Sequence, residues 1–203
     1  AGRSARVRNI QVHGQETDRA QAGMRTAINL QGFSREEVER GQWVVPVGVF
    51  KPTRLMDARL DLLDKPPRGE VKIHLGTAEL TGELSMHEVD GLAVARIRLK
   101  EPVIAASGDR FIIRSISPAK TIAGGMVINP SPHRRFSPDI ARDLLSDERP
   151  RQVAGMVRDA GLRGISRKDL AAVFAEEPSS LDKTLSELLS SGRIVRFDPN
   201  NDL

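Results

Sequence analysis

The sequence predicts a mainly β protein with a smaller α-helical part, in which antiparallel β-barrels are followed by a winged-helix domain. The first indication is a series of short segments with alternating apolar residues over residues 51–130, separated by turns rich in Gly, Pro and Asp. The second is a proline-containing stretch at residues 131–136. The third is a change to the helical period of apolar residues from residue 137 onwards. These observations divide the chain into a β-rich part and a helical part.

Residues 1–50 have the pattern of part of a first β-barrel. Residues 5–13 and 25–30 alternate and predict two strands, and residues 42–45 predict a third strand that a proline ends. Ser34 is followed by three glutamates, which predicts a short helix. A serine can cap the first turn, and acidic side chains favour the positive end of the helix dipole.

Residues 51–130 predict one complete small barrel. The turns within this range contain Pro-Pro-Arg-Gly, Asp-Gly and Ser-Gly-Asp sequences. Closure of the sheet would remove its exposed edges. The six expected strands are residues 55–63, 70–75, 78–86, 92–99, 110–116 and 120–128.

Residues 131–136 predict a stiff, extended linker, and residues 137–203 predict a first winged-helix domain. Ser137 before a proline and Ser166 are expected helix caps. Three helices followed by a strand at residues 193–197 form the start of a winged helix. The second strand of its wing is expected to be missing by residue 203.

The charge distribution favours the β-rich part as the side that meets an anionic partner. Residues 1–136 carry a formal charge of +6 and residues 137–203 carry −2, within a total of +4. A basic patch attracts a phosphate backbone, although a surplus of this size is also common on an ordinary solvated surface.

Several classes of function lack their sequence signals. The chain has no cysteine, which removes disulfides and thiolate chemistry and fits a reducing cytosol. It has no apolar run long enough for a transmembrane helix, no Gly-x-x-x-x-Gly-Lys-Ser/Thr loop and no metal-ligand spacing. We therefore expect no membrane association, no metal site and no enzymatic activity in this chain.

Two sets of motifs resemble one protein family. The sequences A-G-M-R-T-A-I-N-L at residues 22–30 and E-E-V-E-R-G at residues 36–41 resemble the second barrel of the elongation factor Tu superfamily. The sequences H-L-G-T-A-E at residues 74–79 and T-I-A-G-G at residues 121–125 resemble the third domain of the bacterial selenocysteine-specific elongation factor, the SelB type. The helical part after residue 137 supports this choice, because elongation factor Tu ends after its barrel.

The resemblance implies a division of the chain and a function for the whole protein. Residues 1–50 would be part of domain II, residues 51–130 domain III and residues 137–203 the first winged helix. The whole protein would be a cytoplasmic GTPase using GTP and Mg²⁺, and it would deliver selenocysteinyl-tRNA to the ribosome at a recoded UGA codon. An mRNA hairpin would be bound by winged helices beyond this chain, and the GTPase domain and its cofactors would also lie outside it.

The resemblance also implies site residues. Arg25 matches the arginine that lines the family's aminoacyl pocket, where a fixed guanidinium would favour the selenolate of selenocysteine over neutral serine. His74 and Thr77 match the surface that meets the acceptor and T stems of tRNA, and the basic residues Arg134 and Arg135 could contact phosphates. Each of these also has a plainer interpretation, as a solvated arginine, a strand-end histidine, a turn threonine or a solvated linker pair.

Three alternatives remain open at this point. The chain could come from another translational GTPase with a helical appendix, or from a barrel and winged-helix regulator that binds duplex DNA, or from a protein-interaction scaffold. A DNA regulator should carry its positive charge on the winged helix. The candidate recognition helix at residues 181–191 has one lysine and two acidic residues, so a spacer role fits it better.

Overall fold

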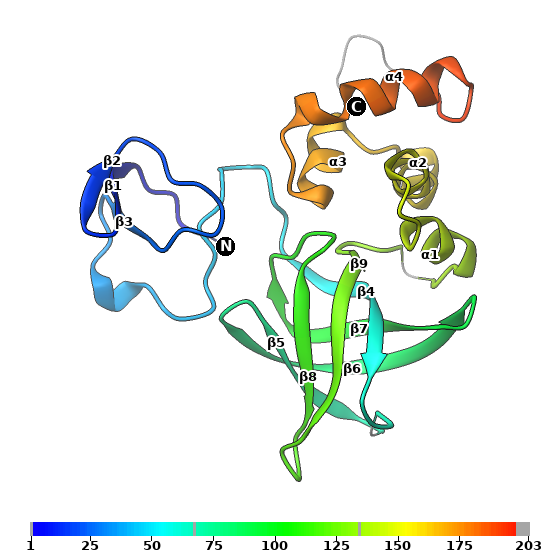
Figure 1. Cartoon of the computed structure of the whole chain (residues 1–203), viewed down its shortest axis with the longest axis horizontal. Coiled ribbons are helices and arrows are strands. Elements are labelled where there is room, and N and C mark those ends of the chain that lie inside the picture. Colours follow the sequence, from blue (N-terminus) through cyan, green and yellow to red (C-terminus); the bar gives the residue numbers. More distant parts are fainter. Residues whose placement is uncertain (1, 67, 134, 198–203) are drawn as a thin grey trace. The chain divides into compact units, whose positions relative to one another are not determined.

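The computed structural model describes residues 2–66, 68–133 and 135–197. The chain divides into two compact units, Ala1–Gln42 and Trp43–Leu203, which are considered separately below. Figure 1 shows the strands of the first unit in blue and the barrel and helices of the second unit from cyan to red. The division falls at Gln42, eight residues before the end that the sequence predicts for the first barrel.

The first unit is a three-stranded antiparallel sheet with the order β2-β1-β3. Its strands are β1 (Val7–Val12), β2 (Gln15–Thr17) and β3 (Thr26–Leu30). The predicted helix is a single 3-10 turn, η1 (Arg35–Glu37), in which the Ser34 N–H donates to the Glu37 carboxylate at 2.8 Å. This bond is the main reason why the pKa of Glu37 lies below its usual value, and the Arg3 guanidinium lowers it further.

No described residue of the first unit is fully buried. Val7, Met24, Ile28 and Val38 stay between 42% and 45% exposed, because three strands cannot enclose a core. The predicted strand at residues 42–45 is wrong: this segment is irregular. It runs into Pro46, which cannot donate a ladder hydrogen bond.

The second unit contains a closed antiparallel barrel with the order β4-β7-β6-β5-β8-β9. All six predicted strands are confirmed. They are β4 (Thr53–Leu62), β5 (Glu70–Leu75), β6 (Ala78–Val89), β7 (Leu92–Val103), β8 (Arg110–Ser115) and β9 (Thr121–Asn129). Burial alternates along β5, so that Val71, Ile73 and Leu75 fill the interior while the residues between them face outward.

The helical part begins with the predicted Ser137 cap, whose side chain accepts from the Ile140 N–H. Ser166 caps α3 in the same way, accepting from the Asp169 N–H at 3.0 Å. The α-helices are α1 (Pro138–Leu144), α2 (Arg149–Ala160), α3 (Arg167–Phe174) and α4 (Asp182–Ser190); short 3-10 turns lie at η2 (Gly161–Arg163) and η3 (Pro178–Leu181).

The predicted strand at residues 193–197 is wrong, because this segment has no strand conformation. A strand is defined by a hydrogen-bonded neighbour, and within the described residues no second strand lies beside it. Leu188 instead accepts backbone hydrogen bonds from the N–H groups of Arg193 and Ile194, which fold the chain back on α4.

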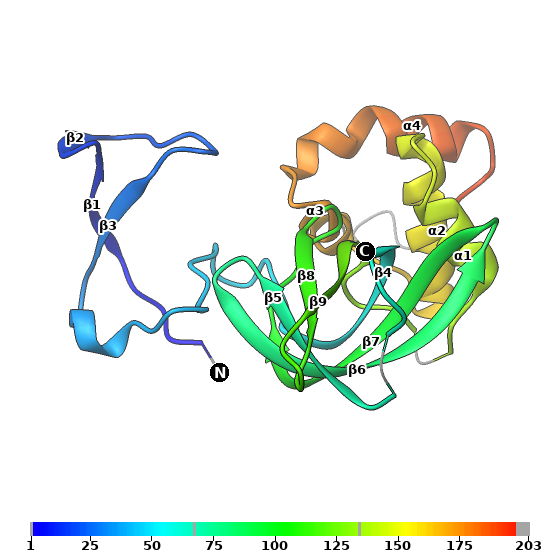
Figure 2. The ribbon, with the colours of Figure 1, turned by 60° about the horizontal axis from the view of Figure 1, so that its bottom comes forward.

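The barrel and the helices share one hydrophobic cluster. Val89, Val94 and Ile128 point away from the barrel interior and join a core with residues of α1, α2, α3 and α4. The long β6–β7 hairpin runs alongside α1, as Figure 2 shows. No helix in the described ranges is long and apolar enough to cross a membrane.

Candidate nucleic-acid interface

Arg25 lies directly before β3, after a tight turn. The Met24 N–H donates to the Gln21 carbonyl at 3.1 Å, and Gly23 has a φ of +89°, a conformation that glycine adopts without strain. This turn leaves the Arg25 side chain exposed at the start of the strand. The guanidinium is therefore available to an anionic partner, as a pocket residue would need to be.

His74 and Thr77 lie on the same hairpin of the barrel. His74 is on β5, and Gly76 and Thr77 form the two-residue turn between Leu75 and Ala78. His74 is half-buried and faces outward, whereas Thr77 is exposed. The structure thus brings these two predicted residues together at one end of the β5–β6 hairpin.

Three basic residues missed by the sequence analysis share the outer side of the barrel with His74. Lys72 precedes it on β5 and forms an ion pair with Glu79 at 2.9 Å. This bond lowers the pKa of the Glu79 carboxyl, and His74 and Arg114 add to the effect through their charge. Arg110 and Arg114 lie on the neighbouring strand β8 with exposed side chains. The alternation along β5 and β8 indicates from the sequence that these four side chains face outward, and the pairing of the two strands makes them neighbours.

Of the two predicted phosphate contacts in the linker, the described one, Arg135, does not lie on the strands of this surface. Arg135 is exposed in the segment between β9 and α1, and Arg134 lies outside the described residues. The same segment is tied to α2, since the Asp159 carboxylate accepts from the Asn129 side chain at 2.8 Å and from the His133 N–H at 3.3 Å.

The joint between barrel and helices contains a buried ion pair. The Arg96 guanidinium donates two hydrogen bonds of 2.8 Å to the Asp57 carboxylate, and the two residues are 7% and 6% exposed. Burial raises the pKa of the Asp57 carboxyl, and Arg96 opposes that rise. Beside this pair, the rings of His87 and Phe136 stack with centroids 3.7 Å apart.

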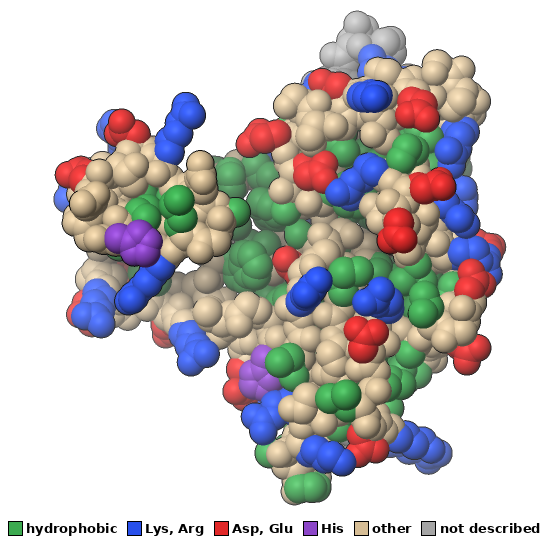
Figure 3. Space-filling model, viewed as in Figure 1, with side chains coloured by type: hydrophobic (Ala, Val, Ile, Leu, Met, Phe, Trp, Pro, Cys, Tyr) green, Lys and Arg blue, Asp and Glu red, His purple; other side chains and the backbone are tan. Residues whose placement is uncertain are grey.

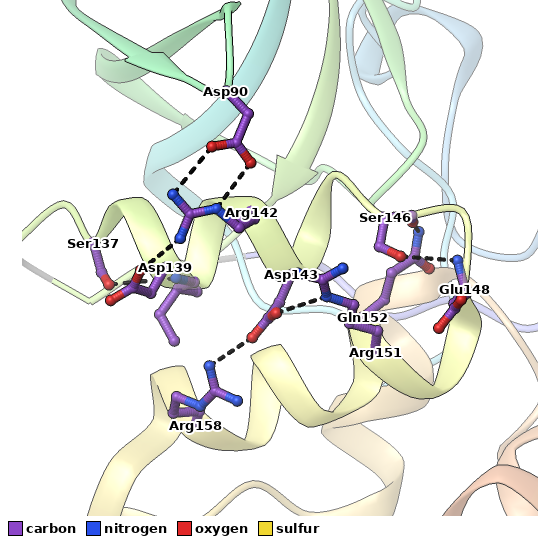
Figure 4. Close-up of polar contacts among 11 residues, drawn as sticks. Asp90, Ser137, Asp139, Arg142, Asp143, Ser146, Glu148, Arg151, Gln152 and Arg158 are labelled. Carbon is purple, nitrogen blue, oxygen red and sulfur yellow. Dashed lines mark hydrogen bonds and ion pairs between the residues drawn. The ribbon is translucent and has the colours of Figure 1, made fainter.

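A second polar group links the tip of the β6–β7 hairpin to α1 and α2 (Figure 4). Arg142 donates to both carboxylate oxygens of Asp90, at 2.8 and 3.1 Å, and to Asp139 at 2.7 Å. Asp143 on the same helix accepts from Arg151 at 2.9 Å and from Arg158 at 2.6 Å. Together with the shared core, these bonds fix the helices on the barrel.

The joint gives a pH-dependent prediction. Burial lowers the pKa of His87 below 6.5 and Arg96 lowers it further, while Asp57 opposes them. Because the pKa of His87 is lower in the folded protein than in the unfolded chain, the unfolded chain binds more protons below about pH 6.5. The stability that this site contributes is therefore present above about pH 6.5 and declines below it. We expect the free energy of unfolding to fall when the pH is lowered from about 7.5 to about 5.

The variant His87→Phe keeps a flat ring against Phe136 but cannot bind a proton, so its free energy of unfolding should fall less over the same range. Denaturant titrations of both proteins at the two pH values test this, and equal pH dependence in both would contradict it.

A cavity of about 320 Å³ lies between the linker before β4, the end of β9 and helices α2 and α3. Its acidic residues already have partners: Asp169 pairs with Lys51 at 2.8 Å, and Asp159 binds Asn129 and His133. In the described part of the chain no three His, Asp or Glu residues are grouped closely enough to hold a metal ion. The outer surface of the barrel is therefore the better candidate site.

The comparisons with known proteins agree with this barrel. Residues 66–134 match the family model described as the beta-barrel domain of the selenocysteine-specific elongation factor. The selenocysteine-specific elongation factor of Desulfomicrobium baculatum is 34% identical over 212 residues, covering 98% of this chain and 33% of the relative. That of Escherichia coli (strain K12) is 34% identical over 137 residues, covering 64% of this chain and 21% of the relative.

The fold is also shared with a solved structure. The crystal structure of a bacterial selenocysteine-specific elongation factor EF-Sec matches with a TM-score of 0.69 and 22% identity, over 88% of this chain and 30% of that one. The chain belongs to the family of selenocysteine-specific elongation factors. It spans about a third of the length of the first relative and about a fifth of the second.

Proposed function

We propose that this chain is the tRNA-binding middle part of a factor that delivers selenocysteinyl-tRNA to the ribosome at a recoded UGA codon. The observation that carries the proposal is the group of exposed basic residues around His74 on the barrel that matches the family model. This barrel belongs to the β-rich part of the chain, which carries the net positive charge. Phosphate contacts from such residues supply most sequence-independent affinity for nucleic acids.

In this proposal the parts of the chain have separate tasks. The sheet of residues 1–42 contributes Arg25 to the aminoacyl pocket, and the barrel holds the acceptor arm of the tRNA with His74 and Thr77. The helical part acts as a spacer toward winged helices that bind the mRNA hairpin. The shared core and the Arg142–Asp90 pair support a stiff spacer, because both would have to break before the helices could move. GTP binding with Mg²⁺, GTP hydrolysis and work in the cytoplasm belong to the whole factor.

Binding of selenocysteine-specific tRNA to this chain across a salt series tests the proposal. Elongator serine tRNA and a random DNA duplex are the controls. We expect selective tRNA binding that weakens as salt rises, because the contacts release counterions. Preference for DNA would replace the proposal with a DNA-binding regulator, and absence of any nucleic-acid binding would refute tRNA binding by this chain.

Arg25→Ala is expected to reduce the preference of the full-length factor for selenocysteinyl-tRNA over seryl-tRNA by about tenfold. A selenol is ionised at neutral pH, so it can form a charge-assisted hydrogen bond with the guanidinium, and the substitution removes this bond. A serine hydroxyl is neutral, so the substitution should change its binding much less. Arg19→Ala is the matched control, since Arg19 is another exposed arginine of the first unit. Equilibrium binding of the two aminoacyl-tRNAs measures the ratio, and an unchanged ratio would remove Arg25 from the pocket.

A further inference from the structure

The tip of the β6–β7 hairpin carries a sequence that is open to chemical modification. Asp90-Gly91 is the one Asp-Gly pair in the sequence, which contains no Asn-Gly pair. Val89 pairs with Leu92, so Asp90 and Gly91 form an exposed two-residue turn outside the strand pairing. In an Asp-Gly sequence the backbone nitrogen of the glycine can reach the side-chain carboxyl carbon of the aspartate, because glycine has no side chain to hinder the approach. The turn is therefore a candidate site for the isomerisation of aspartate to isoaspartate.

The isomerisation has two steps and needs only water. The Gly91 nitrogen forms a bond to Cγ of Asp90 and loses its proton, and the protonated carboxyl group loses one oxygen as water, which leaves a five-membered succinimide ring. Water then opens the ring. Cleavage between the nitrogen and Cγ restores aspartate, whereas cleavage between the nitrogen and the backbone carbonyl carbon gives isoaspartate. In isoaspartate the backbone runs through Cβ and Cγ and is one atom longer, and the carboxylate is attached directly to Cα.

The ion pair with Arg142 opposes the first of these steps. The guanidinium donates to both carboxylate oxygens of Asp90, at 2.8 and 3.1 Å, so the carboxyl group is held toward α1 (Figure 4). The hydrogen bonds to Arg142 are also the main reason why the pKa of the Asp90 carboxyl lies below its usual value. The protonated form that can release water is therefore rare, and its carbon is kept away from the Gly91 nitrogen.

The same carboxylate joins the hairpin to the helices. Arg142 lies on α1 and also donates to Asp139 at 2.7 Å, and β6 contacts α1. Along the right-hand side of Figure 3, where α1 lies, basic and acidic side chains stand next to one another, as paired charges do. An isoaspartate at position 90 would lengthen the turn and place its carboxylate on a shorter arm, so it could not hold Arg142 in the same geometry.

We propose that Asp90 is an isomerisation site at the joint between barrel and helices, that Arg142 protects it, and that conversion to isoaspartate detaches the β6–β7 hairpin from α1. An exposed isoaspartate is the substrate of carboxyl methyltransferases that use S-adenosylmethionine, so the modified turn also presents a target for that class of enzyme. The modification does not depend on tRNA binding and lies beyond the proposed function.

Ageing of the wild type, Arg142→Ala and Arg158→Ala in neutral buffer over several weeks tests the proposal. Peptide mass spectrometry detects the succinimide as a loss of one water, and electron-transfer fragmentation distinguishes isoaspartate from aspartate at position 90. We expect isoaspartate to form at Asp90 slowly in the wild type and about threefold faster in Arg142→Ala, a factor that matches the strength of an exposed ion pair. Arg158→Ala is the matched control and should keep the wild-type rate, since Arg158 is an exposed arginine of the same joint that pairs with Asp143.

Each part of the proposal has a result that would overturn it. Absence of isoaspartate at Asp90 in all three proteins would refute the site, and equal rates in wild type and Arg142→Ala would refute the protection. Equal acceleration in both arginine variants would assign the effect to a loosened fold. Arg142→Lys keeps the charge without the forked geometry, so it should give an intermediate rate even if Arg142→Ala does not fold. Hydrogen exchange in α1 and in the hairpin tip should rise in aged wild type that carries isoaspartate at position 90, and unchanged exchange would refute the detachment.

Discussion

Gly125→Ala is expected to destabilise the barrel by about 3 kcal/mol, the upper part of the range for an overpacked core. The added methyl group would lie 2.3 and 2.6 Å from atoms of the Phe111 ring and 2.9 Å from Leu60. Both residues are only 4% exposed, so neither can turn aside into solvent. The free energy of unfolding, taken from urea titrations, measures the effect.

Gly124→Ala is the matched control for this prediction. It makes the same chemical change one residue earlier in β9, where nothing lies within 4 Å. We expect the control to be as stable as the wild type or more stable by about 0.5–1 kcal/mol, because alanine restricts the unfolded chain more than glycine does. Equal stability of the two variants would show that the barrel relaxes around Phe111 and would contradict the packing argument.

Asp57→Asn is expected to lower the free energy of unfolding by about 3–5 kcal/mol. The change leaves the Arg96 guanidinium in a site where it is 7% exposed and has lost the carboxylate that receives two of its hydrogen bonds. Denaturant unfolding at neutral pH measures the loss. Because the pair lies at the joint, hydrogen exchange in α1 should rise together with exchange in β4 and β7.

Replacing both partners separates the attraction of the pair from the burial of its charges. Burial raises the pKa of Asp57 in spite of Arg96, so removal from water is a large part of the balance for this carboxylate. The double variant Asp57→Leu/Arg96→Met is therefore expected to be much closer to the wild type than Asp57→Asn. A double variant as unstable as the single one would contradict this account and would assign the loss to packing. Asp61→Asn is the surface control, because Asp61 is exposed on the same strand and lies 3.6 Å from Arg59.

The barrel could be predicted from the sequence because its signal is local. Each strand alternates between a buried and an exposed face, and turn sequences stand between the strands, so all six elements follow from neighbouring residues. The Ser137 and Ser166 caps are local in the same sense, since a cap bonds three residues ahead. The two predictions that were wrong, strands at residues 42–45 and 193–197, concern segments that contain apolar residues but pair with no other strand among the described residues.

The candidate site was predictable only in part. Arg25, His74 and Thr77 were found through motifs, and the structure brings His74 and Thr77 onto one hairpin. Arg110 and Arg114 were missed as site residues because they lie 36 and 40 residues from His74 in the sequence and come near it only through the pairing of β5 with β8. The roles of Arg134 and Arg135 stay predictions, and Arg135 lies in the linker and not on the strands that carry His74 and the exposed arginines of β8.

The sequence by itself determined the six barrel strands and their order, the change to helices after residue 137, the excess of basic residues in the β-rich part and the family motifs. These features depend on composition and on short-range periods. Only the tertiary structure decided which glycine of the Gly124-Gly125 pair is required by packing, that Asp57 and Arg96 meet across 39 residues, and that the helices share a core with the barrel. The physical reason is that steric contact, desolvation and register depend on distances in space between residues far apart in the chain, which periodicity along the chain does not encode.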